Sequence, residues 1–485
     1  MISVVIVVWW LVMCGALIWR EYFLPHAPAG PATGAAKELE EREEWMGIYA
    51  QGQKIGHAST RLHRSKNGWV LEESAFLRLS LLGIPRELKS TTVVEATEGF
   101  VLKSFLTRVE SGPTRFEAEG KMLESQLSVQ IRSAGRVREI SIPMKENPFV
   151  PQTIRYMLAL QGQLKTGQRY RFPMVDPFTL AMEPMEIVVE AVERVRWGER
   201  DVDALRLSYH WAGLHSRAWV NPEGEVLREE GFGGLSMLRE SREQALGQGW
   251  AVGKGVDLFR AMSVPTERHL EEPRRTSYLK VRLSGADLSE FAMVGTRQRR
   301  SRYEVEVFKE DLEKACSYEL PHPRTEHLAA FLDPTAFIQS DDPAIRDTSR
   351  KILQAETDAI KAVELILAWV HENLEKLPTL SVPSAVEVLK TRQGDCNEHA
   401  VLFAALARAA GIPTKICAGI LYMEGRFYYH AWNEVFLGQW FSLDSLLGQF
   451  PADATHIKFV EGELESQAKL VSLMGNLKVE ILAHR

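Results

Sequence analysis

Two hydrophobic patterns divide the chain, and the first extends from Trp45 to about Arg242. In this region apolar and polar residues alternate in short runs that Gly, Pro and Asn interrupt, as is typical of antiparallel strands. "WMGIYAQGQKIGHASTRLHR" predicts a hairpin around Gln51-Gly52, and "SRAWVNPEGEVLREE" predicts two strands joined across residues 221–224. "PFVPQTIRYMLALQ" predicts one helix. We therefore expect a curved antiparallel sheet, shaped as an open half-barrel.

The second pattern is helical and follows a boundary at "LGQGWAVGKG". "TSYLKVRLSG" and "SRYEVEVFKED" predict a few further strands. In "DDPAIRDTSRKILQ" and "DAIKAVELILAWVHENL" the apolar residues then recur three and four positions apart, which predicts amphipathic helices. They lead into "GDCNEHAVLFAALARAAGIP", an alanine-rich helix that begins near Cys396 and ends at Gly411.

The first residues, "MISVVIVVWWLVMCGALIW", are uncharged and mostly apolar over a length close to the minimum for a membrane-spanning helix. No basic region precedes this stretch and no small-residue cleavage site lies close to it, so an uncleaved anchor is favoured over a signal peptide. The Pro/Ala/Gly-rich and then acidic stretch that follows predicts a tether. We expect the body of the protein to be extracytoplasmic, in the periplasm.

The predicted fold class is α+β, with a membrane helix followed by two folded regions, because 485 residues exceed one ordinary core. The expected divisions are an anchor at 1–20, a linker at 21–44, a β-rich domain at 45–245, a linker with accessory strands at 246–312 and a C-terminal α+β domain at 313–485.

Net charge and cysteine content limit the ligands and partners that the protein is expected to bind. The net charge of −6 offers no basic footprint for nucleic acid, so we exclude that class of partner. The four cysteines, Cys14, Cys316, Cys396 and Cys417, form no CxxC pair, and neither a disulfide framework nor a zinc site is indicated. We expect no metal and no cofactor, and at least one free thiol.

Cys396 lies at the predicted start of a helix, a position that favours a reactive thiol. Asp395 is a good N-cap residue and Glu398 stands three positions later, as in a capping box. Cys396 therefore occupies the first helical turn, where free N–H groups and the helix dipole favour a thiolate. From this position alone we expect a lowered thiol pKa, an activated nucleophile and N–H groups able to hold an oxyanion.

"RFYYHAWNEVFLGQWFSLDSL" predicts a hairpin whose loop is Leu437-Gly438-Gln439. With that loop, Trp432 lies opposite Asp444 and His430 is the diagonal neighbour of Asp444. This geometry allows the imidazole to meet the carboxylate, whereas a slip of one residue would separate them onto opposite faces.

The order Cys, His, Asp resembles the transglutaminase-like superfamily of papain-like thiol enzymes. "GDCNEHA" at 394–400, "RAAGIP" at 408–413, "HAWNEV" at 430–435 and "WFSLD" at 440–444 carry the resemblance, which covers roughly residues 326–459. The family fold packs a helix carrying Cys on an antiparallel sheet carrying His and Asp. Ser445 departs from the pattern, since many relatives have proline there.

The resemblance implies a role for each matching residue. Cys396 is the nucleophile, His430 the general base and later acid, and Asp444 the residue that orients the imidazole. Beside these, Gln393 is a candidate second oxyanion donor by its proximity, and Trp432 and Trp440 are expected to wall the site. A packing or capping role is expected for His399, and His456 is expected to be a structural element.

The activity implied is attack on an amide or peptide carbonyl through a Cys thioester. We expect a cysteine peptidase or amidase acting on a protein or peptide. The alternatives are a protein-glutamine transglutaminase and an inert, membrane-tethered binding or assembly protein. The β-rich region is weakly similar to the sheet-plus-helix domains by which some bacterial envelope proteins hold lipoproteins or other partners. We therefore consider an envelope protein as its partner, and a β-domain without a specific ligand as the alternative.

Overall fold

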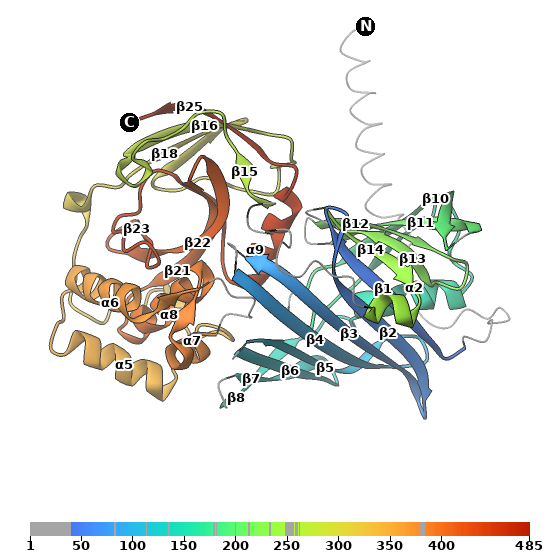
Figure 1. Cartoon of the computed structure of the whole chain (residues 1–485). Coiled ribbons are helices and arrows are strands. Elements are labelled where there is room, and N and C mark those ends of the chain that lie inside the picture. Colours follow the sequence, from blue (N-terminus) through green and yellow to red (C-terminus); the bar gives the residue numbers. More distant parts are fainter. Residues whose placement is uncertain are drawn as a thin grey trace, which may run out of the picture.

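Strands dominate the structure, and one antiparallel sheet contains most of them (Figure 1). The predicted anchor at 1–20 lies outside the described residues, and within these residues no helix is both long and apolar enough to cross a bilayer. The membrane helix of the predicted fold class is therefore not confirmed, and the class itself is mostly β with few helices. The computed structural model describes residues 40–485 apart from 82–83, 113, 134–135, 178–179, 181, 199, 212–213, 232–233, 248–256, 258–259, 261 and 378–383.

The large sheet has fourteen strands in the order β8-β7-β6-β5-β4-β3-β2-β1-β14-β13-β12-β11-β10-β9. Each strand pairs antiparallel with its neighbours, and the pairing of β1 with β14 joins the two halves of the meander. Its strands are β1 (Arg42–Ala50), β2 (Gln53–Ser65), β3 (Gly68–Leu81), β4 (Ile84–Ala96), β5 (Leu102–Ser111), β6 (Thr114–Leu123), β7 (Gln126–Ser133), β8 (Arg136–Pro143), β9 (Arg169–Phe172), β10 (Met185–Trp197), β11 (Arg200–Trp211), β12 (Leu214–Val220), β13 (Val226–Glu230) and β14 (Leu235–Glu240).

The two hairpins predicted from sequence are present. β1 and β2 are joined by Gln51 and Gly52, whose φ angles of 49° and 77° are those of a tight two-residue turn. Asn221 begins the turn between β12 and β13, where its side-chain oxygen accepts from the N–H groups of Glu223 and Glu225. β1 begins at Arg42, so the acidic residue Glu44, predicted to lie in a tether, is a buried strand residue.

The predicted helix in this region is α2 (Pro151–Leu160), followed much later by the short α3 (Arg242–Leu246). Ile154, Met157 and Leu158 of α2 are buried in the same core cluster as residues from strands on both sides of β1. The helix therefore fills the curve of the sheet, and burial of its apolar face stabilises both.

The C-terminal half contains three small sheets and most of the helices. A five-stranded sheet has the order β15-β22-β21-β24 with β23 paired to β22, a four-stranded sheet has the order β17-β18-β16-β25, and β19 pairs with β20. The strands are β15 (Val264–Pro265), β16 (Tyr278–Ser284), β17 (Gln298–Ser301), β18 (Glu304–Phe308), β19 (Glu375–Lys376), β20 (Gln393–Gly394), β21 (Thr414–Met423), β22 (Arg426–Phe436), β23 (Trp440–Leu443), β24 (His456–Glu461) and β25 (Lys478–His484); the helices are α5 (Pro343–Leu353), α6 (Ala359–Asn373), α7 (Ala385–Thr391), α8 (Cys396–Ala409) and α9 (Leu464–Gln467); the 3₁₀ turns are η2 (Pro273–Arg275), η3 (Leu312–Lys314), η4 (Ala329–Phe331) and η5 (Ala468–Leu473).

Helix α8 forms the centre of this half. Its residues from Ala400 to Ala407 are all buried, and they pack with α5, α6, α7 and one face of β22 in a single core cluster. Small alanine side chains allow the surrounding elements to approach the helix closely on every side. The N-terminal end of α8 is therefore held firmly at the edge of the five-stranded sheet.

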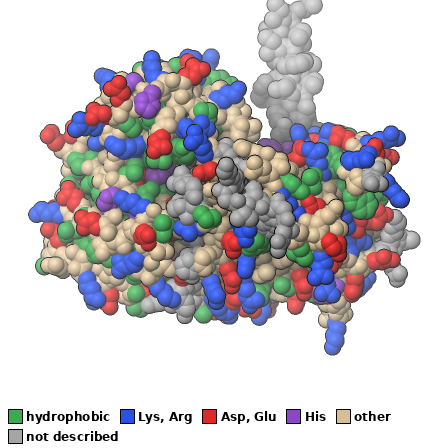
Figure 2. Space-filling view, in the orientation of Figure 1, with side chains coloured by type: hydrophobic (Ala, Val, Ile, Leu, Met, Phe, Trp, Pro, Cys, Tyr) green, Lys and Arg blue, Asp and Glu red, His purple; other side chains and the backbone are tan. Residues whose placement is uncertain are grey.

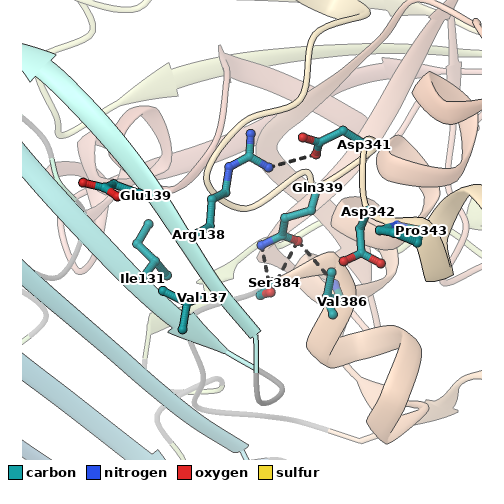
Figure 3. Close-up of a pocket in the computed structure, with 10 residues that line it drawn as sticks. All are labelled: Ile131, Val137, Arg138, Glu139, Gln339, Asp341, Asp342, Pro343, Ser384 and Val386. Atoms are coloured by element: carbon teal, nitrogen blue, oxygen red, sulfur yellow. Dashed lines mark hydrogen bonds and ion pairs between the residues drawn. The ribbon is translucent and has the colours of Figure 1, made fainter.

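The two halves are in contact. Phe337 from the C-terminal half belongs to the core cluster of the large sheet, where its ring lies 6.3 Å from that of Phe116. Arg138 of β8 forms an ion pair with Asp341 at 3.0 Å beside a cavity of about 610 Å³ (Figure 3). On the face shown in Figure 2, acidic and basic side chains are interspersed, as expected from the small net charge.

Candidate active site

The predicted position of Cys396 at the start of a helix is confirmed. Asp395 caps α8 by accepting from the N–H of Asn397, and the Glu398 carboxylate accepts from the N–H of Asp395, which completes the capping box. The side chain of Cys396 is buried, and the residue is only 8% exposed. The sulfur is therefore enclosed by protein at the N-terminal end of the helix.

The edge of β22 gives Cys396 its hydrogen-bond donor. On this edge β15 pairs with β22 only as far as Phe427, and β23 begins to pair at Asn433. Among the described residues no strand covers the edge between these two points. The backbone N–H of Ala431 lies in this gap and donates to the Cys396 thiol. Cys396 thus contacts the residue that directly follows His430.

The register of the β22–β23 hairpin agrees with the prediction. Phe436 pairs with Trp440 and Asn433 with Leu443, so the same register places Trp432 opposite Asp444, one residue beyond the end of β23. His430 Nε2 lies 2.7 Å from Asp444 Oδ2. The structure therefore brings the predicted imidazole and carboxylate into direct hydrogen-bond contact, with both side chains buried.

Asp444 is fixed by more than His430. Its Oδ1 accepts from the N–H of Leu447, and its backbone exchanges two hydrogen bonds with Gln449. Burial opposes ionisation of this carboxyl, but the imidazoles of His430 and His456 outweigh burial and hold the pKa of Asp444 well below its usual range. Asp444 is thus a carboxylate at neutral pH and accepts a hydrogen bond from His430 Nε2–H.

His456, for which the sequence predicted a structural role, makes a contact with Asp444 that the sequence did not predict. Its Nε2 lies 3.0 Å from the same Oδ2 of Asp444, and its Nδ1 lies 3.1 Å from the backbone oxygen of Asp453 and 3.4 Å from its carboxylate. Burial alone would lower the pKa of His456, but the Asp453 and Asp444 carboxylates raise it. Because both ring nitrogens face acceptors, the imidazolium form is favoured.

His430, Asp444 and His456 also form the one group of described residues whose ligand-type atoms converge as a metal site would require, within 4.8 Å. The two hydrogen bonds to Asp444 account for this convergence. Cys396, His399 and Cys417 do not converge in this way among the described residues, and His399 donates from Nδ1 to the backbone oxygen of Asp395 at 2.7 Å.

The three residues expected around the predicted triad of Cys396, His430 and Asp444 differ in their placement. Trp432 is buried, with its ring stacked on that of His430 at 6.2 Å and in an edge-to-face contact with that of His456 at 5.2 Å. Trp440 packs on Phe331 and Phe436, with the Lys415 ammonium over its ring. Gln393 donates to Glu375. Of the three, Trp432 alone has a described contact with a triad residue.

The pKa expectation for Cys396 is wrong. Burial, and then the charge of Asp395, raise the thiol pKa well above its ordinary value, and the hydrogen bond from Ala431 does not offset them. The helix-dipole argument omitted desolvation, which disfavours the thiolate. The resting form of Cys396 is therefore a neutral thiol, and an acceptor must take its proton before the sulfur can react.

Comparison with known proteins identifies the core around these residues. Residues 346–445 match the family model described as the transglutaminase-like superfamily, a range that includes Cys396, His430 and Asp444. Over 95 residues the chain is 35% identical to an uncharacterized protein of Haemophilus influenzae. The aligned stretch covers 19% of this chain and 26% of that protein. The chain thus matches about a quarter of the length of this relative.

Three solved structures are similar at low sequence identity. A "Putative Cysteine Protease" from Cytophaga hutchinsonii is 16% identical and covers 43% of this chain and 87% of its own, with a TM-score of 0.29. A beta-barrel-like protein of a domain of unknown function from Brucella abortus is 11% identical, covers 42% and 95%, and has a TM-score of 0.33. A "Putative Protease" from Parabacteroides distasonis is 10% identical, covers 78% and 70%, and has a TM-score of 0.21.

Proposed function

We propose, from the match of residues 346–445 to the transglutaminase-like superfamily, that the protein is a thiol enzyme that attacks amide or peptide carbonyls. The observation that carries the proposal is the hydrogen-bonded pair of His430 and Asp444, at 2.7 Å, beside the Ala431 N–H that contacts Cys396. The reaction that we propose is hydrolysis, as in a cysteine peptidase or amidase.

The reaction begins with proton transfer, because the resting thiol is neutral. Asp444 engages Nε2 of His430, which leaves Nδ1 as the nitrogen that takes the proton from the Cys396 thiol. The sulfur then adds to the carbonyl carbon, and the imidazolium gives its proton to the departing amine or ammonia. A thioester on Cys396 remains.

The thioester is resolved by water in a peptidase or amidase, and by an amine in a transglutaminase. In either case His430 takes a proton from the attacking molecule and returns it to the sulfur as the thioester breaks. The backbone N–H of Cys396, at the start of α8, is available to stabilise the oxyanion of both tetrahedral intermediates. Gln393 is engaged with Glu375 and does not supply the second donor in this arrangement.

The test uses the full chain with a glutamine-rich protein, with and without a biotinylated primary amine. We expect an acyl-enzyme on Cys396 by mass spectrometry, followed by new termini or ammonia release. Cys396→Ser and His430→Ala should each abolish both signals, whereas Cys316→Ser, at an exposed thiol, should not. Incorporation of biotin would identify a transglutaminase instead, and an absence of both products and acyl-enzyme would favour the inert binding protein.

We also propose a periplasmic location, with the N-terminal apolar segment as anchor and an envelope protein as partner of the large sheet. The support is the sequence pattern alone. A reporter that is active only outside the cytoplasm, fused after Arg485, tests the location. Activity of a cytoplasm-specific reporter at the same position would contradict it.

A further inference from the structure

A second cavity lies inside the curve of the large sheet, far along the sequence from Cys396. It has a volume of about 370 Å³, within the range of small-molecule sites. Strands on both sides of β1 line it, and α2 contributes Gln152 and Arg155. In contrast, the cavity of Figure 3 lies between the two halves, and its Arg138 and Gln339 are already engaged with Asp341 and Ser384.

The wall of the cavity combines apolar and charged side chains. Its apolar part can receive a hydrocarbon group, since methionine and aliphatic side chains adapt to such a ligand. Its charged part consists of one arginine and three glutamates. The apolar side chains are Met46, Ile48, Met185, Val226 and Met237, and the charged ones are Glu44, Glu73, Arg155 and Glu229.

The single arginine that lines the cavity, Arg155, already interacts with Glu44 and Tyr156. Arg155 lies 3.6 Å from Glu44 and donates to the hydroxyl of Tyr156, which in turn donates to Glu44 at 2.5 Å. Arg239 also lies 3.6 Å from Glu44. The charge of Glu44 is therefore compensated on two sides.

Glu73 and Glu229 are compensated only by the charge of Arg155, which acts on both carboxyls and does not offset their burial. Glu73 is hydrogen-bonded to Thr60 and Gln152, but among the described residues no cation lies within ion-pair distance of either carboxyl. Burial raises the pKa of Glu73 to about 7 and raises that of Glu229 as well. Nearby, Gln152 Oε1 is buried without a partner. The cavity therefore holds two carboxyl groups with no cation at ion-pair distance among the described residues, and an unused acceptor.

We propose that this cavity binds a small amphipathic molecule that carries a primary amine. The ammonium group lies at Glu73 and Glu229 and can also donate to Gln152 Oε1. The hydrocarbon part lies against the methionines and Val226. Such a ligand supplies a positive charge at ion-pair distance from these carboxyls and the missing donor, whereas a carboxylate would add a further anion to the site. This inference is independent of the reaction at Cys396.

Octylamine, octanol and octanoate are matched probes, because they share the hydrocarbon chain and differ in the head group. We expect isothermal titration calorimetry to show saturable binding of octylamine to the full chain. Octanol and octanoate should bind with affinities at least about tenfold lower, because each lacks the charge pair that the amine forms. Binding of octanoate as tight as that of octylamine, or no saturable binding of the amine, would overturn the proposal.

A pair of adjacent glutamates provides the control. Glu73→Gln removes the charge at nearly constant shape and should weaken octylamine about tenfold while octanol binding is unchanged, which shows that the cavity is intact. Glu72→Gln, on the opposite face of β3, should leave both affinities unchanged. If Glu73→Gln binds octylamine as the unaltered chain does, the carboxylate is not the recognition element and the inference is wrong.

Discussion

At the scale of single residues, the distinctive feature is that two imidazoles share Asp444 Oδ2. In a simple triad the carboxylate compensates only the histidine that takes the thiol proton. Here His456 adds a second positive charge to the same oxygen and is itself held by Asp453. In the proposed mechanism His456 is therefore a positioning residue that also sets how much of the Asp444 charge is available to His430.

His456→Gln tests this role, because an amide can still donate to Asp444 but carries no charge. The Asp453 and Asp444 carboxylates raise the pKa of His456, and the loss of its charge leaves Asp444 with one compensating imidazole fewer, so we expect the acidic limb of the kcat/KM profile to move to higher pH. Asp453→Asn, which weakens the charge on His456, should shift the limb in the same direction. His327→Gln, at an exposed histidine, should not shift it.

A purely structural His456 would give a different result. The variants would then lose thermal stability and overall rate with no movement of the pH profile. Measurement of the unfolding midpoint beside the pH profile distinguishes the two outcomes.

At the scale of elements, the sequence predicted those contacts of the site that join residues close together in the chain. The three-residue loop at Leu437-Gly438-Gln439 fixes the β22–β23 register and hence the meeting of His430 with Asp444. The contact of His456 with Asp444 was not predicted. It depends on the pairing of β24 with β21, a long-range contact that no local sequence pattern encodes. The pKa of Cys396 was predicted with the wrong sign because burial depends on the whole core around α8.

The start of α8 offers a test of the electrostatics at Cys396. Asn caps a helix about as well as Asp, so Asp395→Asn should change stability by less than about 0.5 kcal/mol. It removes the neighbouring charge that, after burial, raises the pKa of the Cys396 thiol. We expect alkylation of Cys396 by iodoacetamide at pH 7.5 to accelerate roughly three- to tenfold.

Site-resolved mass spectrometry measures this rate, with the exposed Cys316 as a reference within the same molecule. Asp358→Asn is the matched control, because Asp358 is the N-cap of α6 and should affect helix stability alone. An unchanged or slower rate in Asp395→Asn would show that its charge does not govern the thiol.

At the scale of the whole molecule, the cavity in the large sheet should appear in the pH dependence of stability. Burial raises the pKa of Glu73 from 4.5 to about 7, so between these values the folded chain holds a proton that the unfolded chain has lost. The free energy of unfolding therefore falls as pH rises through this window, by an amount on the order of 3 kcal/mol. Such a cost is typical of a group retained for binding.

Glu73→Gln should accordingly raise the free energy of unfolding at pH 8 and have little effect at pH 4.5, as measured by urea denaturation. Glu72→Gln should show no such difference between the two pH values. Equal effects of Glu73→Gln at both pH values would mean that its carboxyl does not titrate abnormally in the folded chain.

The position of Phe337 has a consequence for the inheritance of this architecture. Its ring completes the interior of the large sheet although its own chain segment leads into the helices of the other half. A recombination event that exchanged either half for an unrelated module would leave a hollow on one side and an unshielded aromatic ring on the other. We therefore expect substitutions around Phe337 in one half to be accompanied by compensating substitutions in the other half.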